Sequence, residues 1–160
     1  MATASNRWTN EQSSFELVVP GVLDADSSTG PANLDAEIRT QVWLLLGALY
    51  PNARPINRRR FQRYPYPHLI HLTPVGESGE SLDERPLVVA GKNISEHGIS
   101  FFHSGPLALR RAIASLETGS GNWFHFLVDL TWCRFTHHGW YESGGFFLRP
   151  VPAPPAMIRG

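Results

Sequence analysis

Two short segments of the chain hold the side chains with the most distinctive chemistry. The first is the run RRRFQR, in which Arg58, Arg59, Arg60 and Arg63 are clustered, and the second is the run NISEHG at residues 93–98. An arginine side chain presents a planar fork of donors that pairs with phosphate oxygens, reads the O6 and N7 edge of guanine and stacks on flat rings. The first segment therefore indicates a local anionic or aromatic binding partner.

The second segment places Asn93, Ser95 and Gly98 at a spacing that suits a tight turn. Asparagine and serine are short polar side chains that hydrogen-bond either to a ligand or to their own turn. Gly98 can adopt a positive φ angle, which a Cβ atom would penalise. The segment thus predicts a turn between two strands, which either binds a ligand or serves only to reverse the chain.

Taken together and in this order, the two segments resemble the PilZ domain family, whose members bind cyclic di-GMP. The family has an Arg-x-x-x-Arg loop ahead of its barrel and an Asp/Asn-x-Ser-x-x-Gly turn farther along the chain. The residues that match are Arg59, Arg63, Asn93, Ser95 and Gly98, with Asn at the position where Asp is more common.

The resemblance covers about residues 55–150 and implies a fold and a ligand site. The implied fold is an all-β core, a six-stranded antiparallel PilZ-like barrel, with the arginine loop folded over cyclic di-GMP on the barrel's outer face. The N-terminal α-helix added to this core lies outside the resemblance. Trp132 and Trp140 mostly suit packing; the alternative is that one of them stacks on a guanine, and Trp140, beside a turn, is then preferred. The ligand-binding residues implied in this way are Arg58, Arg59, Arg60, Arg63, Asn93, Ser95, Gly98, Gly144 and Trp140.

Cyclic di-GMP suits these side chains because it carries two phosphates and two guanines. Hydrogen bonds from guanidinium to phosphate are charge-assisted and roughly twice as strong as those between neutral groups. Each bidentate contact to guanine contributes about 1–3 kcal/mol of discrimination. After the cost of ordering an arginine-rich loop, a few such contacts predict a micromolar complex, about −8 kcal/mol, with one or two ligand molecules.

The composition favours a single folded domain over a disordered, fibrous or disulfide-bonded chain. The 160 residues are 42% hydrophobic and 18% charged, with 14 Gly, 13 Pro and one Cys. The formal net charge is zero, yet residues 1–50 carry −4 and residues 51–160 carry +4. Five arginines lie between Arg54 and Arg63, whereas Lys92 is the only lysine. This local excess on a neutral chain argues against a broad DNA- or RNA-binding surface.

The segment at 34–50 predicts the helix that precedes the barrel. Its apolar side chains recur every three or four residues, Asn33 or Asp35 can cap its start, and Pro51 cannot continue it. The helix either packs on the rest of the fold or forms a homodimer interface. The expected divisions are a flexible tail at 1–32, the helix at 33–51, the PilZ-like barrel at 52–150 and a Pro-rich tail at 151–160.

Short strands separated by turns are expected after residue 64, at 68–73, 87–90, 99–102, 107–116, 123–135 and 140–148. The run at 107–116 also has a helical composition, but its shortness favours a strand. The run at 123–135 is long enough to require a bend or bulge. Gly144 and Gly145 leave room for another backbone or a ligand.

Alternation along 123–135 predicts one buried face. That face holds Phe124, Phe126, Val128, Leu130 and Trp132. The aromatic residues expected in the core are Phe101, Phe102, Phe124, Phe126 and Phe146, while Trp132 and Trp140 are expected mostly to pack.

Other classes of function find less support in the residues. Seven His and one Cys without paired spacing predict no metal site, and no arrangement of Ser, His and Asp predicts a catalytic triad. The expected protein is a non-catalytic cyclic di-GMP receptor whose ligand changes the helix or the contact with a protein partner. The alternatives are a PilZ-like adaptor that has lost the ligand and a small nucleic-acid-binding barrel.

The longest apolar run, Val42–Tyr50, has nine residues, far fewer than the ~20 that span a bilayer. Residues 1–12 lack the apolar region of a signal peptide. We therefore expect a soluble cytoplasmic protein, as befits a bacterial second-messenger receptor.

Overall fold

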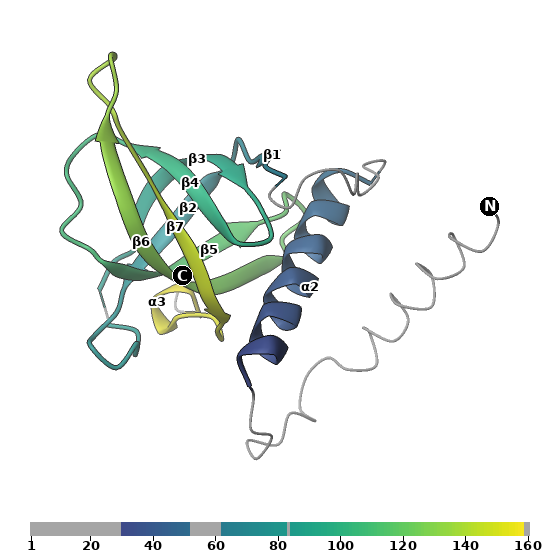
Figure 1. Ribbon diagram of the computed structural model, residues 1–160. Coiled ribbons are helices and arrows are strands. Elements are labelled where there is room, and N and C mark those ends of the chain that lie inside the picture. Colours follow the sequence, from purple (N-terminus) through teal and green to yellow (C-terminus); the bar gives the residue numbers. More distant parts are fainter. Residues whose placement is uncertain (1–29, 52–61, 83, 159–160) are drawn as a thin grey trace. The chain divides into compact units, whose positions relative to one another are not determined.

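The chain folds into antiparallel strands that follow one long helix (Figure 1). The computed structural model describes residues 30–51, 62–82 and 84–158, so the predicted ligand residues Arg58, Arg59 and Arg60 lie outside the described residues. The elements are α2 (Pro31–Leu49), β1 (Tyr64–Pro65), β2 (Leu69–Pro74), β3 (Leu87–Ile94), β4 (Gly98–His103), β5 (Arg111–Glu117), β6 (Trp123–Phe135), β7 (Tyr141–Pro150) and α3 (Pro155–Ile158).

Six strands close into a barrel within the described residues, which confirms the predicted fold class. Around the barrel the hydrogen-bonded order is β3–β2–β5–β6–β7–β4, and β4 pairs again with β3. These pairings are all antiparallel. Closure pairs the strand edges that an open sheet would expose. The short β1 pairs with the end of β3, beyond the residues of β3 that pair with β2.

Local sequence patterns predicted a strand at 107–116, but they did not predict where β3 ends. The strand is confirmed as β5, although it begins at Arg111. β3 does not end at Ala90 as predicted but continues to Ile94. Its second half contains glycine and asparagine, which have low strand propensity, so pairing with β4 and β1 overrides the local preference.

The thirteen-residue β6 has the predicted bounds and the predicted irregularity. Its register with β7 shifts between Leu127 and Val128 and again between Leu130 and Trp132. An inserted residue turns the following side chains to the opposite face. Phe126 and Val128 are buried as predicted, but Trp132 lies beyond the second shift and is 39% exposed. The prediction that Trp132 belongs to the buried face is therefore wrong.

Phe146 is a second correction to the predicted core. It is 57% exposed, whereas the neighbouring Phe147 is buried. Phe147 pairs with Val128 and packs on Phe126 with ring centroids 4.4 Å apart. Because successive strand residues face opposite sides, Phe146 must point outward. The other aromatic residues predicted in the core are buried or partly buried: Phe101, Phe102, Phe124 and Phe126.

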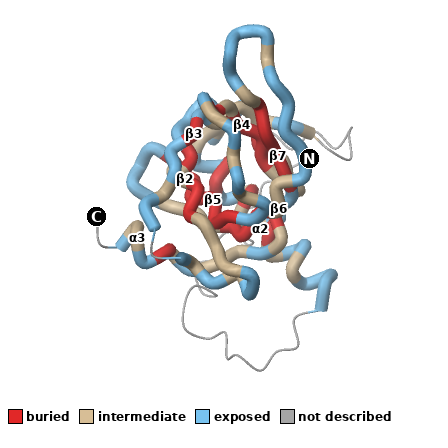
Figure 2. Tube along the Cα trace, turned by 90° about the vertical axis from the view of Figure 1, so that its left-hand side faces the viewer, coloured by how far each residue is buried: buried red, intermediate tan, exposed pale blue. Residues whose placement is uncertain are grey.

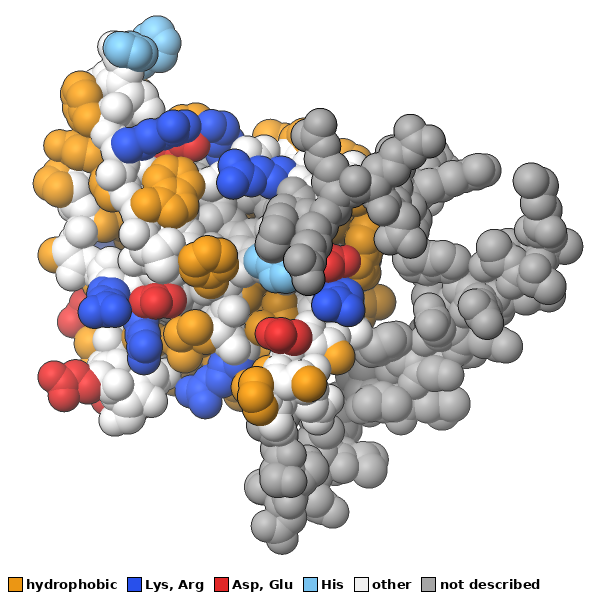
Figure 3. Space-filling model, in the orientation of Figure 1, with side chains coloured by type: hydrophobic (Ala, Val, Ile, Leu, Met, Phe, Trp, Pro, Cys, Tyr) orange, Lys and Arg blue, Asp and Glu red, His pale blue; other side chains and the backbone are white. Residues whose placement is uncertain are grey.

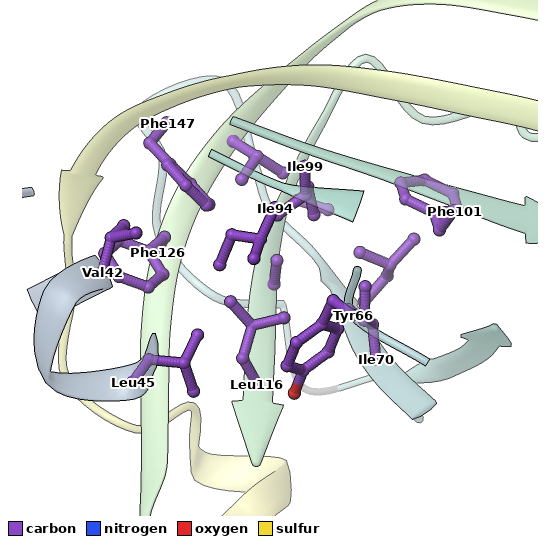
Figure 4. Packing of buried hydrophobic residues seen from close by; sticks show 14 of the residues in the cluster. Val42, Leu45, Tyr66, Ile70, Ile94, Ile99, Phe101, Leu116, Phe126 and Phe147 are labelled. Carbon is purple, nitrogen blue, oxygen red and sulfur yellow. The ribbon is translucent and has the colours of Figure 1, made fainter. Parts of the chain in front are cut away.

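The predicted apolar stripe of α2 packs on the barrel and contacts β7. Ile38, Val42, Leu45 and Leu46 belong to the same buried cluster as the barrel interior (Figure 4). The helix begins at Pro31, earlier than predicted, because a proline in the first turn gives up no helical hydrogen bond. The packed alternative is thus confirmed, and a homodimer through α2 would have to use its other face.

Buried residues concentrate in the centre of the barrel, while the end of the β6–β7 hairpin is exposed (Figure 2). The largest fully buried side chains include Tyr66. Its hydroxyl donates to the carbonyl oxygen of Glu117 at 2.8 Å, so the polar atom inside the core is satisfied. Burial raises the pKa of the Tyr66 phenol.

Three strands approach one another closely at glycines of β4 and β7. A Cβ atom at Gly98 would collide with the carbonyl oxygen of Gly145, and one at Gly145 would collide with the carbonyl oxygen of Asp129. The prediction of a positive φ at Gly98 is wrong, since close approach and not backbone conformation requires glycine there. The described glycines with positive φ are Gly79, Gly119, Gly121 and Gly139.

We expect Gly145→Ala to lower the free energy of unfolding by more than about 2 kcal/mol, because the new Cβ has no space between β7 and β6. Urea unfolding followed by circular dichroism measures the change. Gly47→Ala is the matched control: nothing lies within 4 Å of a Cβ at this helical position. The control should gain about 0.5–1 kcal/mol. Wild-type stability in Gly145→Ala would contradict the packing described for β7.

Candidate functional site

The second motif builds the turn between β3 and β4. Asn93 and Ile94 end β3, and Gly98 begins β4. The N–H of Ser95 donates to the carbonyl oxygen of Gly98 at 2.9 Å. The hydroxyl oxygen of Ser95 accepts from the N–H groups of His97 at 3.2 Å and of Gly98 at 3.3 Å. Ser95 therefore holds the turn closed, and its hydroxyl hydrogen is the atom that it can offer to a ligand.

β1 carries the end of the first motif to this turn. Pro65 of β1 pairs with Asn93 of β3. Arg63 lies two residues before Pro65 and directly before β1, and it is exposed. The structure thus brings the chain that ends the first motif to Asn93, the first residue of the second.

A row of residues crosses four strands on the outer face of the barrel. Trp132 of β6 pairs with Gly144 of β7, Gly144 with Ser100 of β4, and Ser100 with Asn93 of β3. Residues that pair directly across antiparallel strands share a face. A Cβ at Gly144 would come within 2.5 Å of the Trp132 indole, so glycine makes room for that ring. We call these four residues the outer row.

Ser100, in the middle of the outer row, carries an unsatisfied polar atom. Its hydroxyl oxygen is buried and has no hydrogen-bond partner among the described residues. A buried polar group without a partner costs roughly 1–3 kcal/mol. The hydroxyl is therefore a polar group in the outer row for which the described residues supply no partner.

A buried carboxylate joins two basic side chains next to the outer row. Glu142 Oε1 accepts from Lys92 Nζ at 2.7 Å, and its Oε2 accepts from Arg134 Nη2 at 2.6 Å and Nε at 2.9 Å. The Glu142 side chain is 6% exposed. The Arg134 guanidinium lies 5.8 Å from the centre of the Trp132 ring. Glu142 therefore fixes two cations at the edge of the outer row.

The ionisation of Glu142 follows from these contacts. Burial alone would raise the pKa of Glu142, but hydrogen bonds from Lys92 and Arg134 outweigh burial and lower the pKa below its usual 4.5. The carboxylate is therefore charged at neutral pH, and the three side chains together keep one positive charge in excess. This excess favours an anionic ligand on the adjacent surface.

Trp140 lies away from the two motifs. Its neighbour Tyr141 pairs with His103 at one end of β4, whereas Gly98 stands at the other end. β4 has six residues, which corresponds to about 20 Å at roughly 3.3 Å per residue. Trp140 is 47% exposed at the end of the hairpin. Trp132, and not Trp140, is the tryptophan that the structure places in line with Asn93.

The face over β6 and β7 carries basic, acidic and hydrophobic side chains close together (Figure 3). Two cavities lie elsewhere: one of about 510 Å³ between Leu107–Arg110 and Asp129–Thr131, and one of about 450 Å³ beside the Pro150–Pro155 segment. Neither is lined by a motif residue.

Two other kinds of site were sought in the part of the chain that the structure describes. It contains no group of three or more His, Cys, Asp or Glu side chains that could hold a metal ion. None of its helices combines the length and the apolar character needed to cross a membrane.

The predicted ligand residues divide into three groups. Those that lie in or next to the neighbouring strands β1, β3, β4 and β7 are Arg63, Asn93, Ser95, Gly98 and Gly144. Trp140 is separated from them, and Arg58, Arg59 and Arg60 lie outside the described residues. The ligand contacts of the whole set remain predictions.

Sequence reasoning missed Ser100, Lys92, Arg134 and Glu142 as members of this surface. Lys92 did carry a signal, since the only lysine of the chain stands directly before Asn93. Arg134 follows Trp132 by two residues, which places both on one face of a regular strand. Glu142 gave no local signal, because its partners come from two other strands.

No family model and no curated protein matches the chain. Among solved structures, it is similar to the Bacillus subtilis inhibitor of motility MotI/DgrA, with 12% identity and a TM-score of 0.47 over 60% of this chain and 45% of that one. It is also similar to K. pneumonia MrkH in its c-di-GMP complex, with 16% identity and a TM-score of 0.41 over 57% of this chain and 45% of that one.

A third similar structure is the PilZ domain of YcgR from Escherichia coli with c-di-GMP, with 16% identity and a TM-score of 0.41 over 64% of this chain and 86% of that one. This third neighbour is a PilZ domain, the family that the two motifs resemble. The chain spans less than half of the first two. Because all three TM-scores are below 0.5, the function rests on the residues of this chain.

We expect Glu142→Gln to lower the free energy of unfolding at pH 7 by about 1–3 kcal/mol, because Lys92 and Arg134 lose their charged acceptor. The pKa of Glu142 is lower in the folded state than in the unfolded state. The charged carboxylate therefore stabilises the fold at any pH above the unfolded-state pKa, and this contribution is lost as the pH falls through the folded-state pKa. The wild type should therefore lose this contribution below pH 4.5, while the variant should not.

Urea unfolding at pH 7 and at successively lower pH measures both effects. Glu84→Gln, at an exposed position, is the control and should follow the wild type. Parallel pH profiles for Glu142→Gln and the wild type would show that the buried carboxylate does not stabilise the fold.

Proposed function

We propose that this protein is a receptor that binds cyclic di-GMP on the outer face of its barrel, without a catalytic step. The observation that carries the proposal is the β1–β3 pairing, in which Pro65 pairs with Asn93 and the exposed Arg63 lies two residues before Pro65. A guanidinium, an amide and a hydroxyl at one edge are the groups that phosphates and guanine bases require.

Each motif residue has a distinct task in this proposal. Arg63 and Arg59 pair with phosphate oxygens or with the O6 and N7 edge of guanine. Asn93 offers both donors and an acceptor from its amide, and Ser95 donates its hydroxyl hydrogen. Arg58 and Arg60 add positive charge that attracts the ligand. Gly98 contributes by letting β7 approach the turn closely.

The outer row supplies the aromatic surface for a base. The Trp132 ring lies over Gly144, in the row that ends at Asn93. Stacking of a base on an aromatic side chain contributes about 1–3 kcal/mol. Trp132 therefore replaces Trp140 as the residue that we expect to stack on a guanine. Lys92 and the Arg134 guanidinium stand beside this surface and favour the ligand's negative charge.

We expect Arg63→Ala and Arg59→Ala each to weaken cyclic di-GMP binding about 10- to 100-fold, because a hydrogen bond to a charged group contributes roughly 1.5–3 kcal/mol. Isothermal titration calorimetry measures the affinity. Arg85→Ala removes an exposed arginine outside both motifs and should bind as the wild type does.

Wild-type affinity in Arg63→Ala would contradict the assigned role of the first motif. A folded wild-type protein that releases no heat with cyclic di-GMP would favour the alternative of a PilZ-like adaptor without the ligand. Salt-dependent binding of unrelated oligonucleotides would instead indicate a nucleic-acid-binding barrel.

Trp132→Ala should weaken cyclic di-GMP binding about 5- to 100-fold, since a stacked base is lost. Trp140→Ala removes an equally large and exposed side chain at the end of the hairpin, and should leave the affinity close to that of the wild type. Ligand-induced quenching of tryptophan fluorescence provides a second measurement, which Trp132→Ala should abolish. The reverse order of effects would place the base at the hairpin end.

A further inference from the structure

Helix α2 contacts the second motif through Glu96. The indole N–H of Trp43 donates to Glu96 Oε1 at 2.6 Å, and Arg39 Nε lies 3.4 Å from Glu96 Oε2. Glu96 follows Ser95 directly in the turn that holds the motif together. A helix that lies outside both motifs is therefore bonded to the turn on which the candidate site is built.

The same helix also contacts β1. The rings of Trp43 and Tyr64 meet edge to face with centroids 5.8 Å apart, and the Tyr50 hydroxyl donates to the carbonyl oxygen of Pro65 at 2.6 Å. Burial and the nearby Glu96 carboxylate raise the pKa of the Tyr64 phenol, so Glu96 lies close to β1 as well. α2 is thus attached to both segments that meet at the site.

A carboxylate at this position opposes the binding of an anion. Arg63 directly precedes Tyr64, which pairs with Ile94, two residues before Glu96. A Glu96 side chain without partners would either repel a phosphate or pair with Arg63, the cation that the ligand needs. In the observed arrangement Arg39 and Trp43 occupy both carboxylate oxygens. Their contacts leave Arg63 for a ligand.

We propose that α2 regulates the ligand site by holding Glu96. When Arg39 and Trp43 engage the carboxylate, the site is competent to bind the dinucleotide. When α2 shifts and these contacts break, Glu96 pairs with Arg63 and inhibits the site. This inference rests on the proposed function and identifies how the same site is controlled.

A small displacement of α2 is enough for this change. Ile38, Val42 and Leu45 anchor the helix in the core, whereas the Arg39 side chain is 55% exposed on its flank. A slight rotation can therefore break the contacts to Glu96 while the apolar anchors stay buried. By linkage, a ligand that prefers the docked helix must stabilise that helix by the same factor. A partner that binds the exposed flank of α2 would then sense the ligand.

Calorimetric titration of the full chain with cyclic di-GMP tests the proposal. Trp43→Phe removes the indole donor but keeps an aromatic ring, and Arg39→Gln removes the cation. Both should weaken binding about 5- to 20-fold, within the usual range of coupling between sites. Adding Glu96→Gln to either variant should restore nearly wild-type affinity, because the released side chain no longer carries the charge that competes for Arg63.

Two further measurements complete the experiment. Glu37→Gln neutralises another acid of α2 and should bind as the wild type does. Hydrogen exchange of the α2 amides should slow on ligand binding in the wild type, and less so in Glu96→Gln. Circular dichroism and thermal melting show whether each variant is folded. Because Arg39→Gln changes an exposed side chain, its result does not depend on how Trp43 packs.

The outcomes separate this proposal from the proposed function. Weakened binding that Glu96→Gln does not restore would show that Trp43 and Arg39 act only through packing, and overturns the proposal. Unchanged binding in both single variants also overturns it, while the proposed function stands. Absence of binding by the wild type overturns the proposed function and this inference with it.

Discussion

The close approach of β7 to β4 and β6 determines where a ligand site can form on this barrel. Gly98 and Gly145 lack a Cβ because the neighbouring backbone occupies that space, and Gly144 leaves its place to the Trp132 ring. The outer face therefore has small residues in its middle and larger side chains at its edges, with Trp132 on one side and Asn93 on the other. The packing that closes the barrel also creates the surface.

The whole chain has no net charge, but several charged side chains lie beside the outer row. Two carboxylates lie beside a surface suited to an anion, and each is engaged by basic side chains. Glu142 is 6% exposed and bonded to Lys92 and Arg134, and losing such a buried pair would be costly. Glu96 is 29% exposed and its ion pair with Arg39 is weaker. Burial therefore makes the first carboxylate structural and leaves the second free to exchange partners.

Local sequence patterns predicted the elements better than they predicted the contacts between them. The alternation of β6 and the apolar stripe of α2 depend on periodicity alone, and both were found. The outward face of Trp132 was not, because the register shift between Leu130 and Trp132 reverses the alternation at a position that the sequence does not mark. Phe146 was assigned to the core that its neighbour Phe147 occupies. The bond between Trp43 and Glu96 joins residues 53 positions apart, which periodicity cannot reveal. The two motifs were recognised because each is contiguous in the chain.

The way α2 is anchored limits how the site can communicate with a partner. Its apolar stripe is part of the barrel core, and burying each such side chain contributes about 1.5–3 kcal/mol, so full release of the helix would be expensive. β1, by contrast, has only two paired residues, and so short a strand adds little stability of its own. The movable unit is therefore β1, the turn with Glu96 and the flank of α2 that touches both. A ligand bound across Arg63 and Asn93 would tighten this unit while the closed barrel stays unchanged.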